Sequence, residues 1–322
     1  MRVRRLVDRP IISPESHPSI GGNIQGPSLI RMPDWIAGRL GDYYLYFADH
    51  KGSYIRLAYA DRLDGPWTIH APGSLRLDQS HFLTAPPTVS PAQLARFEAR
   101  WRTSGSRMSH DLLAEITTPH IASPDVHVDP DRRQIVMYFH GLDDVGTQVS
   151  RVATSTNGID FVAEPQILGP SYLRAFRRAG VTYALTMPGR FYRSADGFRD
   201  FAPGPSLFNP RMRHAALLRR GAELLVFWTQ VGDAPERILV SRIDLSGDWL
   251  GWRDAPPREV LRPEYDWEGA DAPLVPSVRS TAYGHVNQLR DPAIFEENGR
   301  VYLLYAVAGE SGIAIAEVCV DG

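Results

Sequence analysis

The sequence lacks most of the features that identify secreted, membrane-bound or thiol-dependent proteins. It has one cysteine, Cys319, among 322 residues, which excludes a disulfide framework and a thiolate metal cluster. No apolar stretch approaches the about 20 residues that a membrane-spanning helix needs. The basic start, MRVRRLVDRPII, has no apolar segment of the kind that signal peptides carry. We therefore expect a cytoplasmic protein without a membrane anchor.

An excess of charge of one sign is also missing. The chain has 35 lysines and arginines against 37 aspartates and glutamates, a net charge of −2. Because charge-driven binding to nucleic acid or to an anionic membrane needs a basic surplus, we expect neither partner. Phosphate-binding glycine loops, the GxSxG elbow, dinucleotide fingerprints and the HExxH zinc motif are absent too. The sequence thus predicts no tightly bound cofactor.

What the chain contains instead is a repeat. Five times an apolar strand is followed by a tight turn, an aromatic-rich strand, a polar loop and a third strand. The copies start at Gly26, Ser123, Gly169, Met212 and Arg290. Repetition at this scale, with alternating apolar residues and turn signals such as Asn298-Gly299, is typical of β-propellers. We predict an all-β, five-bladed β-propeller that forms a single domain over residues 1–322.

The ends and two insertions complete this architecture. The last copy stops after its third strand, so we expect residues 1–13 to supply the missing outer strand. Insertions of about 72–119 and 248–288 interrupt the regular spacing. The first contains SPAQLARFEARW, where Ser90 and Pro91 form a helix start, and then SHDLLAEI, which favours a second helix. Strand direction puts both insertions on the face where the inner strands begin, and long loops gathered on one face usually surround a site.

Polar residues recur where the inner strands start and where the second strands end, so the propeller would bring them together on that face. As substrate-binding candidates we select Asn23, Gln25, His50, His120, His140, Tyr172, Arg174, Arg190, Arg213, His214, Gln230, His285, Arg290 and Glu310. Five of these are histidines, but their spacing matches no zinc motif, so we assign no metal ligand. A divalent ion on the propeller axis with a single histidine ligand stays open. The four arginines favour an anionic group in the substrate.

Four carboxylates are candidates for catalysis. Asp125 opens the second inner strand in Ser-Pro-Asp-Val, and Asp291 precedes a proline in the fifth. Glu236 and Glu268 are the candidates for a general acid, Glu268 because its aromatic loop would desolvate the carboxyl group. Each has an ordinary alternative: a strand cap for Asp125, an ion pair for Asp291, a strand start for Glu236 and an exposed loop acid for Glu268.

These segments resemble the five-bladed glycoside hydrolases of family forty-three, the arabinanase and xylosidase group. SPDVHVD…MYFHG is similar to the blade-two APDV…YYLYYS pattern, and DYYLYFADHKGSYIRLAYADRLDGPW to the blade-one hairpin. The resemblance implies an inverting hydrolase in which Asp125 matches the aspartate that tunes and orients. Two motifs depart from the family. The blade-one DPS motif reads Gly26-Pro27-Ser28, without the base, and Leu168 stands where a glutamate normally precedes Gly169-Pro170.

The leading hypothesis is a glycoside hydrolase acting on a small oligosaccharide or glycoside with an anionic group, through paired carboxylates in the central pocket. Such cleavage needs one carboxylic acid and one carboxylate across the sugar ring. Three alternatives stay open. A phosphorylase would use the arginines for inorganic phosphate, a uronate lyase would use histidine and arginine, and a sugar-binding propeller would need no catalytic acid. The sequence does not specify the sugar, the linkage or the oligomeric state.

Overall fold

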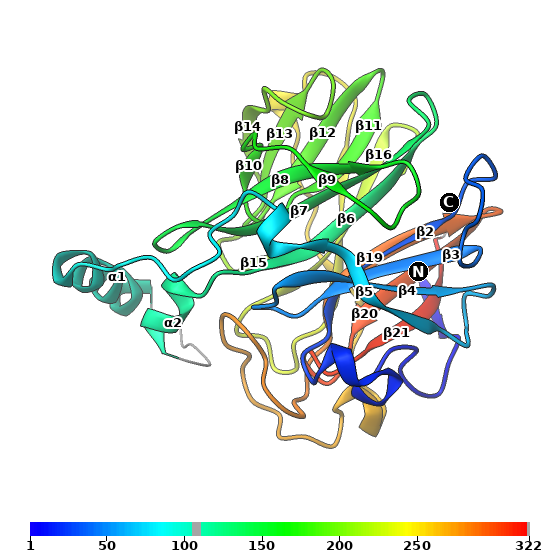
Figure 1. Ribbon diagram of the computed structural model, residues 1–322. Helices are drawn as coiled ribbons and strands as arrows, with labels where there is room; N and C mark the ends of the chain where they lie inside the picture. The colour runs from blue at the N-terminus through cyan, green and yellow to red at the C-terminus, as the bar shows by residue number, and fades with distance from the viewer. Residues whose placement is uncertain (105–110, 321–322) are drawn as a thin grey trace.

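The computed structural model describes residues 1–104 and 111–320, and it has the predicted architecture. Five antiparallel sheets form the blades of a β-propeller, each counted outward from an inner strand (Figure 1). Among the helices of the described residues, none is long and apolar enough to span a membrane. The prediction of an all-β, five-bladed fold with a helical insertion after blade one is confirmed.

Blade one contains β2 (Gln25–Arg31), β3 (Tyr43–Ala48), β4 (Tyr54–Ala60) and β5 (Thr68–Arg76). Blade two contains β6 (Ile121–Asp129), β7 (Gln134–Asp144), β8 (Thr147–Ser155), β9 (Val162–Ala163) and β10 (Gly169–Pro170). Blade three contains β11 (Arg174–Arg178), β12 (Val181–Thr186), β13 (Arg190–Ser194) and β14 (Ala202–Ser206). Blade four contains β15 (Met212–Arg220), β16 (Glu223–Gln230), β17 (Ile238–Asp244) and β18 (Arg258–Leu261). Blade five contains β19 (Arg290–Glu297), β20 (Arg300–Ala306), β21 (Ile313–Cys319) and β1 (Arg2–Arg5).

Helices are confined to the connections. They are α1 (Pro91–Ser104), α2 (Leu112–Thr117) and the short 3-10 turns η1 (Pro14–Ser16), η2 (Pro18–Ile20), η3 (Leu77–Gln79), η4 (Trp249–Gly251) and η5 (Asp266–Glu268). The hydroxyl of Ser90 accepts a hydrogen bond from the Gln93 amide at 3.2 Å, as expected of a helix N-cap. Both predicted helices are present, although residues 109 and 110 of the second segment lie outside the described residues.

Three predicted boundaries differ from the structure. Gly169 and Pro170 form the outer strand of blade two, because they pair with Ser150 and Val149 of β8. The insertion predicted from residue 72 begins after Arg76, where β5 ends, and the insertion predicted over 248–288 contains the outer strand β18. Gly169-Pro170 had been predicted to start the inner strand of blade three, because two residues give no alternation that distinguishes an outer strand. The end of β5 and the four-residue β18 lay within the predicted insertions.

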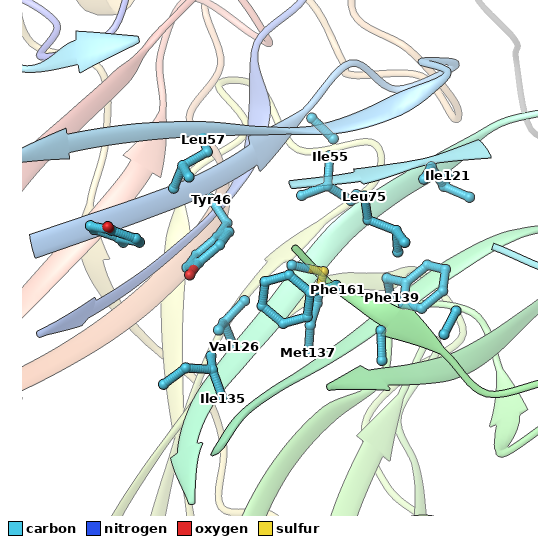
Figure 2. Close-up of a cluster of buried hydrophobic side chains, with 14 of the residues drawn as sticks. Tyr46, Ile55, Leu57, Leu75, Ile121, Val126, Ile135, Met137, Phe139 and Phe161 are labelled. Atoms are coloured by element: carbon cyan, nitrogen blue, oxygen red, sulfur yellow. The ribbon is translucent and has the colours of Figure 1, made fainter. Parts of the chain in front are cut away.

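Large apolar side chains fill the spaces between neighbouring blades. Between blades one and two, Tyr46 and Leu57 pack against Met137 and Phe161, and all four are almost completely buried (Figure 2). The edge of the Tyr46 ring meets Phe161 at a centroid distance of 5.8 Å. Because each blade buries both faces of its sheet in this way, the inner strands are held at fixed positions around the axis.

A residue with a left-handed backbone recurs near the start of the inner strand of every blade. These residues are Gly26 (φ 62°), Ser123 (φ 50°), Tyr172 (φ 63°, two residues before β11), His214 (φ 49°) and Asp291 (φ 47°). In four of the five blades the strand register shifts at this residue, which marks a β-bulge. Since non-glycine residues rarely adopt positive φ, a ring of such residues points to a functional constraint on the axis.

The N-terminal strand closes the ring. β1 pairs with β21 from Arg2↔Cys319 to Arg5↔Ala316, which confirms that the N-terminal segment completes blade five. Both termini therefore lie on the same blade (Figure 1). Arg5 then binds Glu268 through two hydrogen bonds of 2.7 and 2.8 Å, and the Tyr305 hydroxyl donates a third at 3.0 Å. Glu268 is completely buried, so this carboxylate fastens the closing strand.

We expect Glu268→Gln to lower the free energy of unfolding by about 3 kcal/mol, because it leaves Arg5 without its buried counter-charge. Urea denaturation measures the loss. The matched control is Glu317→Gln. Glu317 is the carboxylate partner of Arg4 and Arg300 on the same blade and is more exposed than Glu268, so its loss should lower the free energy of unfolding by about 1 kcal/mol or less. Equal losses in both variants would show that Glu268 is not the fastening group.

Candidate functional site

Three of these left-handed residues, Ser123, Tyr172 and His214, line a cavity of about 130 Å³ at the end of the propeller where the inner strands begin. Its lining comprises Gln25, His50, Trp101, Glu115, Ala122, Ser123, His140, Gln148, Tyr172, Met187, Arg213, His214, Arg279 and Ser280. All five blades or their connections approach it, and both insertions contribute residues to its wall. The predicted gathering of insertions around one face is therefore what the structure shows.

Asp291 lies directly behind this cavity. Its Oδ1 accepts a 2.7 Å hydrogen bond from the Tyr172 hydroxyl and lies 3.7 Å from Nδ1 of His214, and both of these residues line the cavity. Within the described residues, Oδ2 has no hydrogen-bond partner although it is buried. Burial and the negative charge of Glu310 raise the pKa of Asp291 to about 6. This carboxyl group therefore keeps a proton in mildly acidic solution.

Glu310 is the opposite case. It is buried but accepts hydrogen bonds from Asn23 at 2.8 Å and Arg290 at 2.7 Å, and Nδ1 of His50 lies 3.4 Å from it. Burial alone would raise its pKa, but His50 and Arg290 hold the pKa of Glu310 at about 2. Two neighbouring carboxyl groups thus differ in protonation, which is the arrangement that acid–base catalysis uses.

A second buried carboxylate is tied to the cavity wall. Glu236 forms a two-pronged ion pair with Arg213 through Nε and Nη2, and Arg290 lies 3.6 Å away. Burial opposes ionisation of Glu236, yet the two guanidinium groups hold its pKa below the ordinary value. Since a general acid must be protonated, we withdraw Glu236 as the proton donor and assign it to the positioning of Arg213.

Three histidines in or beside the cavity, His120, His140 and His214, have pKa values below the ordinary range. Burial and the charges of Arg213 and Arg290 hold the pKa of His214 well below its usual value. Burial and His120 do the same to His140, and burial and Lys51 lower the pKa of His120 to about 3. His120 does not line the cavity but packs edge-on against His140, with centroids 6.1 Å apart.

The two insertions meet over the cavity. Glu115 of α2 accepts a 2.7 Å hydrogen bond from the Ser280 hydroxyl of the second insertion and lies 3.3 Å from Nζ of Lys51. Trp101 of α1 and Arg279 of the second insertion line the same cavity. The helical insertion therefore forms part of the cavity wall.

Asp125 lies elsewhere. It stands two residues beyond the bulge at Ser123 and lines a separate cavity of about 330 Å³ further along the axis, together with Arg174 and His127. Its Oδ2 accepts hydrogen bonds from the Ala175 amide and from His127, both at 2.8 Å. The structure therefore corrects the expectation that Asp125 and Asp291 share one pocket, and it makes Asp125 a link between the inner strands of blades two and three.

Arg174 has a similar linking role: its guanidinium donates to the carbonyl oxygens of Ala215 and Ser123. Of the other predicted site residues, Glu268 fastens β1 and His285 is exposed beside Asp271 at 2.6 Å. Gln230 accepts a hydrogen bond from Asn209, and Arg190 is exposed over the Tyr192 ring. None of these side chains lines the cavity of about 130 Å³, which we call the upper cavity.

The residues that the sequence did not reveal come mainly from the insertions: Trp101, Glu115, Arg279 and Ser280. They have no repeat partner in other blades, so only the length of the insertions indicated their part of the chain. Among the described residues, no group of three or more histidine, cysteine, aspartate or glutamate side chains is placed to hold a metal ion.

No family model matches the sequence. The uncharacterized protein R118 of Acanthamoeba polyphaga mimivirus is 35% identical over 322 residues, which covers 92% of this chain and 83% of that protein. This level of identity over nearly the whole chain establishes common membership of one family.

Solved structures with a similar fold are glycoside hydrolases. The GH43_1 enzyme of Xanthomonas citri complexed with xylotriose has a TM-score of 0.57 at 12% identity, covering 94% of this chain and 89% of that one. The β-xylosidase/α-arabinofuranosidase CoXyl43, from a compost microbial metagenome, has a TM-score of 0.58 at 12% identity, covering 99% and 96%. The exo-β-1,3-galactanase of Phanerochaete chrysosporium has a TM-score of 0.54 at 10% identity, and the match covers 92% of this chain but 60% of that one. This likeness confirms the resemblance in fold to the family-43 propellers, and by sequence the chain belongs to the family of the mimiviral protein R118.

Proposed function

We propose that the protein is a glycoside hydrolase that removes a single terminal sugar from a small glycoside. The observation that carries the proposal is a pair of buried carboxyl groups behind the cavity: Asp291 lies 3.7 Å from Nδ1 of His214 and Glu310 lies 3.4 Å from Nδ1 of His50. The pKa of Asp291, raised to about 6, and that of Glu310, held at about 2, fit an acid and a carboxylate. The likeness in fold to glycoside hydrolases supports this assignment but does not provide the residues.

The dimensions of the cavity favour a small substrate. About 130 Å³ is less than the about 300–1,000 Å³ of a pocket for a drug-sized ligand, so it suits one sugar ring. Trp101 on the wall offers an apolar face, while Gln25, Gln148 and Ser280 offer groups that bind hydroxyls. The rest of the glycoside would extend past the two insertions into solvent.

Two histidines stand between the carboxyl groups and the substrate. His214 lines the cavity in front of Asp291, and His50 lines it in front of Glu310. With Nδ1 of each ring toward its carboxyl group, Nε2 is the nitrogen left to face the cavity. A carboxyl group behind a histidine sets the orientation of the ring and the direction in which a proton moves.

The proposed reaction adds water across the glycosidic bond. The proton of Asp291 reaches the leaving oxygen through His214 as the bond between the anomeric carbon and that oxygen breaks. A water molecule attacks the anomeric carbon and gives its proton to His50, which the charge of Glu310 stabilises. Return of this proton to Asp291 through solvent restores the site.

This arrangement takes the place of the blade-one aspartate that acts as the base in the family-43 hydrolases and that is Gly26 in this chain. Gly26 occupies the blade-one position, and a Cβ atom built there would lie 2.9 Å from Cα of Ser123. The Gly26 backbone is also left-handed, which strains any other residue. Asp291 is the bulge residue of blade five, so the acidic group has the same local geometry on a different blade.

To test the activity, we would screen nitrophenyl glycosides with and without inorganic phosphate and assay Asp291→Asn on any substrate that turns over. We expect phosphate-independent release of nitrophenol, a loss of about 100-fold or more in kcat/KM in Asp291→Asn, and a decline of wild-type kcat/KM above a pH of about 6.

The matched control is Asp271→Asn, an exposed aspartate on a loop outside the cavity, which should retain wild-type kcat/KM. A strict phosphate requirement with release of a sugar phosphate would identify a phosphorylase instead, and an ultraviolet-absorbing unsaturated product would identify a lyase. Sugar binding without turnover on any glycoside would identify a binding protein.

Asp291→Asn should also change how stability depends on pH. Because the pKa of Asp291 is raised in the folded protein, its stabilising contribution is complete below a pH of about 4 and is lost as the pH rises through about 6. We expect the difference in free energy of unfolding between pH 5 and pH 7, measured in urea, to favour pH 5 more in wild type than in Asp291→Asn. The same pH dependence in both proteins would contradict the assignment of the raised pKa to this residue.

A further inference from the structure

Arg279, a cation in the cavity wall, has no carboxylate partner among residues 1–104 and 111–320. Arg279 lines the cavity, and its only hydrogen bond within the described residues goes to the carbonyl oxygen of Pro210, at 3.1 Å. Burial and the nearby charge of Arg213 lower the pKa of Arg279, which means that its charge is poorly compensated. Holding two like charges together in a partly buried wall is unfavourable unless an anion binds there.

Three other cations around the cavity have carboxylate partners. Lys51 has Glu115 at 3.3 Å, and Arg290 has Glu310 at 2.7 Å. Arg213 has Glu236, and its remaining nitrogen Nη1 donates to the carbonyl oxygen of Val278, the residue before Arg279. Within the described residues, Arg279 is therefore the arginine of the cavity lining that has no carboxylate partner.

We propose that Arg279, with Arg213 beside it, binds the carboxylate of an acidic sugar, so that the terminal residue removed is a uronic acid. The planar fork of a guanidinium group matches the two oxygens of a carboxylate. A carboxylate brings one negative charge to this one unpaired arginine of the lining, whereas a phosphate monoester brings a charge of about −1.5 to −2. This inference rests on the proposed glycosidase function for its substrate, but the anion site itself can be tested by binding.

The test measures the unfolding temperature of the full chain with about 50 mM glucuronate or galacturonate, with the matching neutral sugars glucose and galactose, and with inorganic phosphate and sulfate. A ligand that binds the folded state alone raises this temperature. We expect at least one uronate to raise it by about 2 °C or more while its neutral counterpart does not. A rise with phosphate or sulfate but with neither uronate would overturn the assignment to an acidic sugar, and no rise with any anion would overturn the site.

Arg279→Gln should abolish the uronate-dependent rise, and Arg279→Lys, which keeps the charge but not the fork, should retain part of it. The control Arg211→Gln removes an exposed arginine beside Pro210 that does not line the cavity, and it should behave like wild type. The unfolding temperature without ligand reports whether each variant is folded. An equal loss of the rise in Arg211→Gln would reduce the effect to general surface charge and contradict the proposal.

A turnover assay with nitrophenyl glucuronides and galacturonides separates this inference from the proposed function. Turnover that falls about 10-fold or more in Arg279→Gln, through a higher KM, supports both. Binding of uronate without hydrolysis of any glycoside leaves the anion site in place and removes the hydrolase assignment. Hydrolysis of neutral glycosides that is unaffected by Arg279→Gln supports the hydrolase assignment and contradicts the anion site.

Discussion

The left-handed residue near the start of each inner strand, with a β-bulge in four of the five blades, is the constraint on which the site depends. In a regular strand successive side chains alternate between the two faces of the sheet. The distortion changes this alternation, and Ser123, Tyr172 and His214, which are far apart in sequence, line one cavity. The hydrogen bond from Tyr172 to Asp291 then joins blade three to blade five across the centre. The same ring separates the upper cavity from the lower one that contains Asp125.

Charge balance is the second organising factor. Glu236, Glu310 and Arg290 are completely buried, which is tolerable only because each has partners of opposite charge at short range. In this network a change at one group alters the protonation of the others: the fixed charge of Glu310 is one reason why Asp291 holds its proton. Protonation states that would be unfavourable in water are thus maintained by the fold.

The sequence was sufficient to predict the propeller, the closing strand and both helices, because these depend on local periodicity, capping and turn residues. It also identified Asp291, His50, His140, Tyr172, Arg213 and His214 as residues of the central face. It misplaced Asp125 although a signal was present: in Gly26-Pro27, Ser123-Pro124 and Asp291-Pro292 the residue before proline is the bulge residue, and Asp125 follows its proline. Glu268 and Arg279 could not be assigned, because their roles depend on how long loops fold against distant strands.

The pairing of β1 with β21 has a consequence for the order in which the protein forms during translation. β1 is made long before β21, the strand with which it pairs, while blades one to four can already assemble from contiguous sequence. Until blade five has been made, the ring stays open and the buried faces of blades one and four lack their neighbour. Nascent chains therefore expose apolar surface until β21 is available, so the finished pocket forms only after this late pairing.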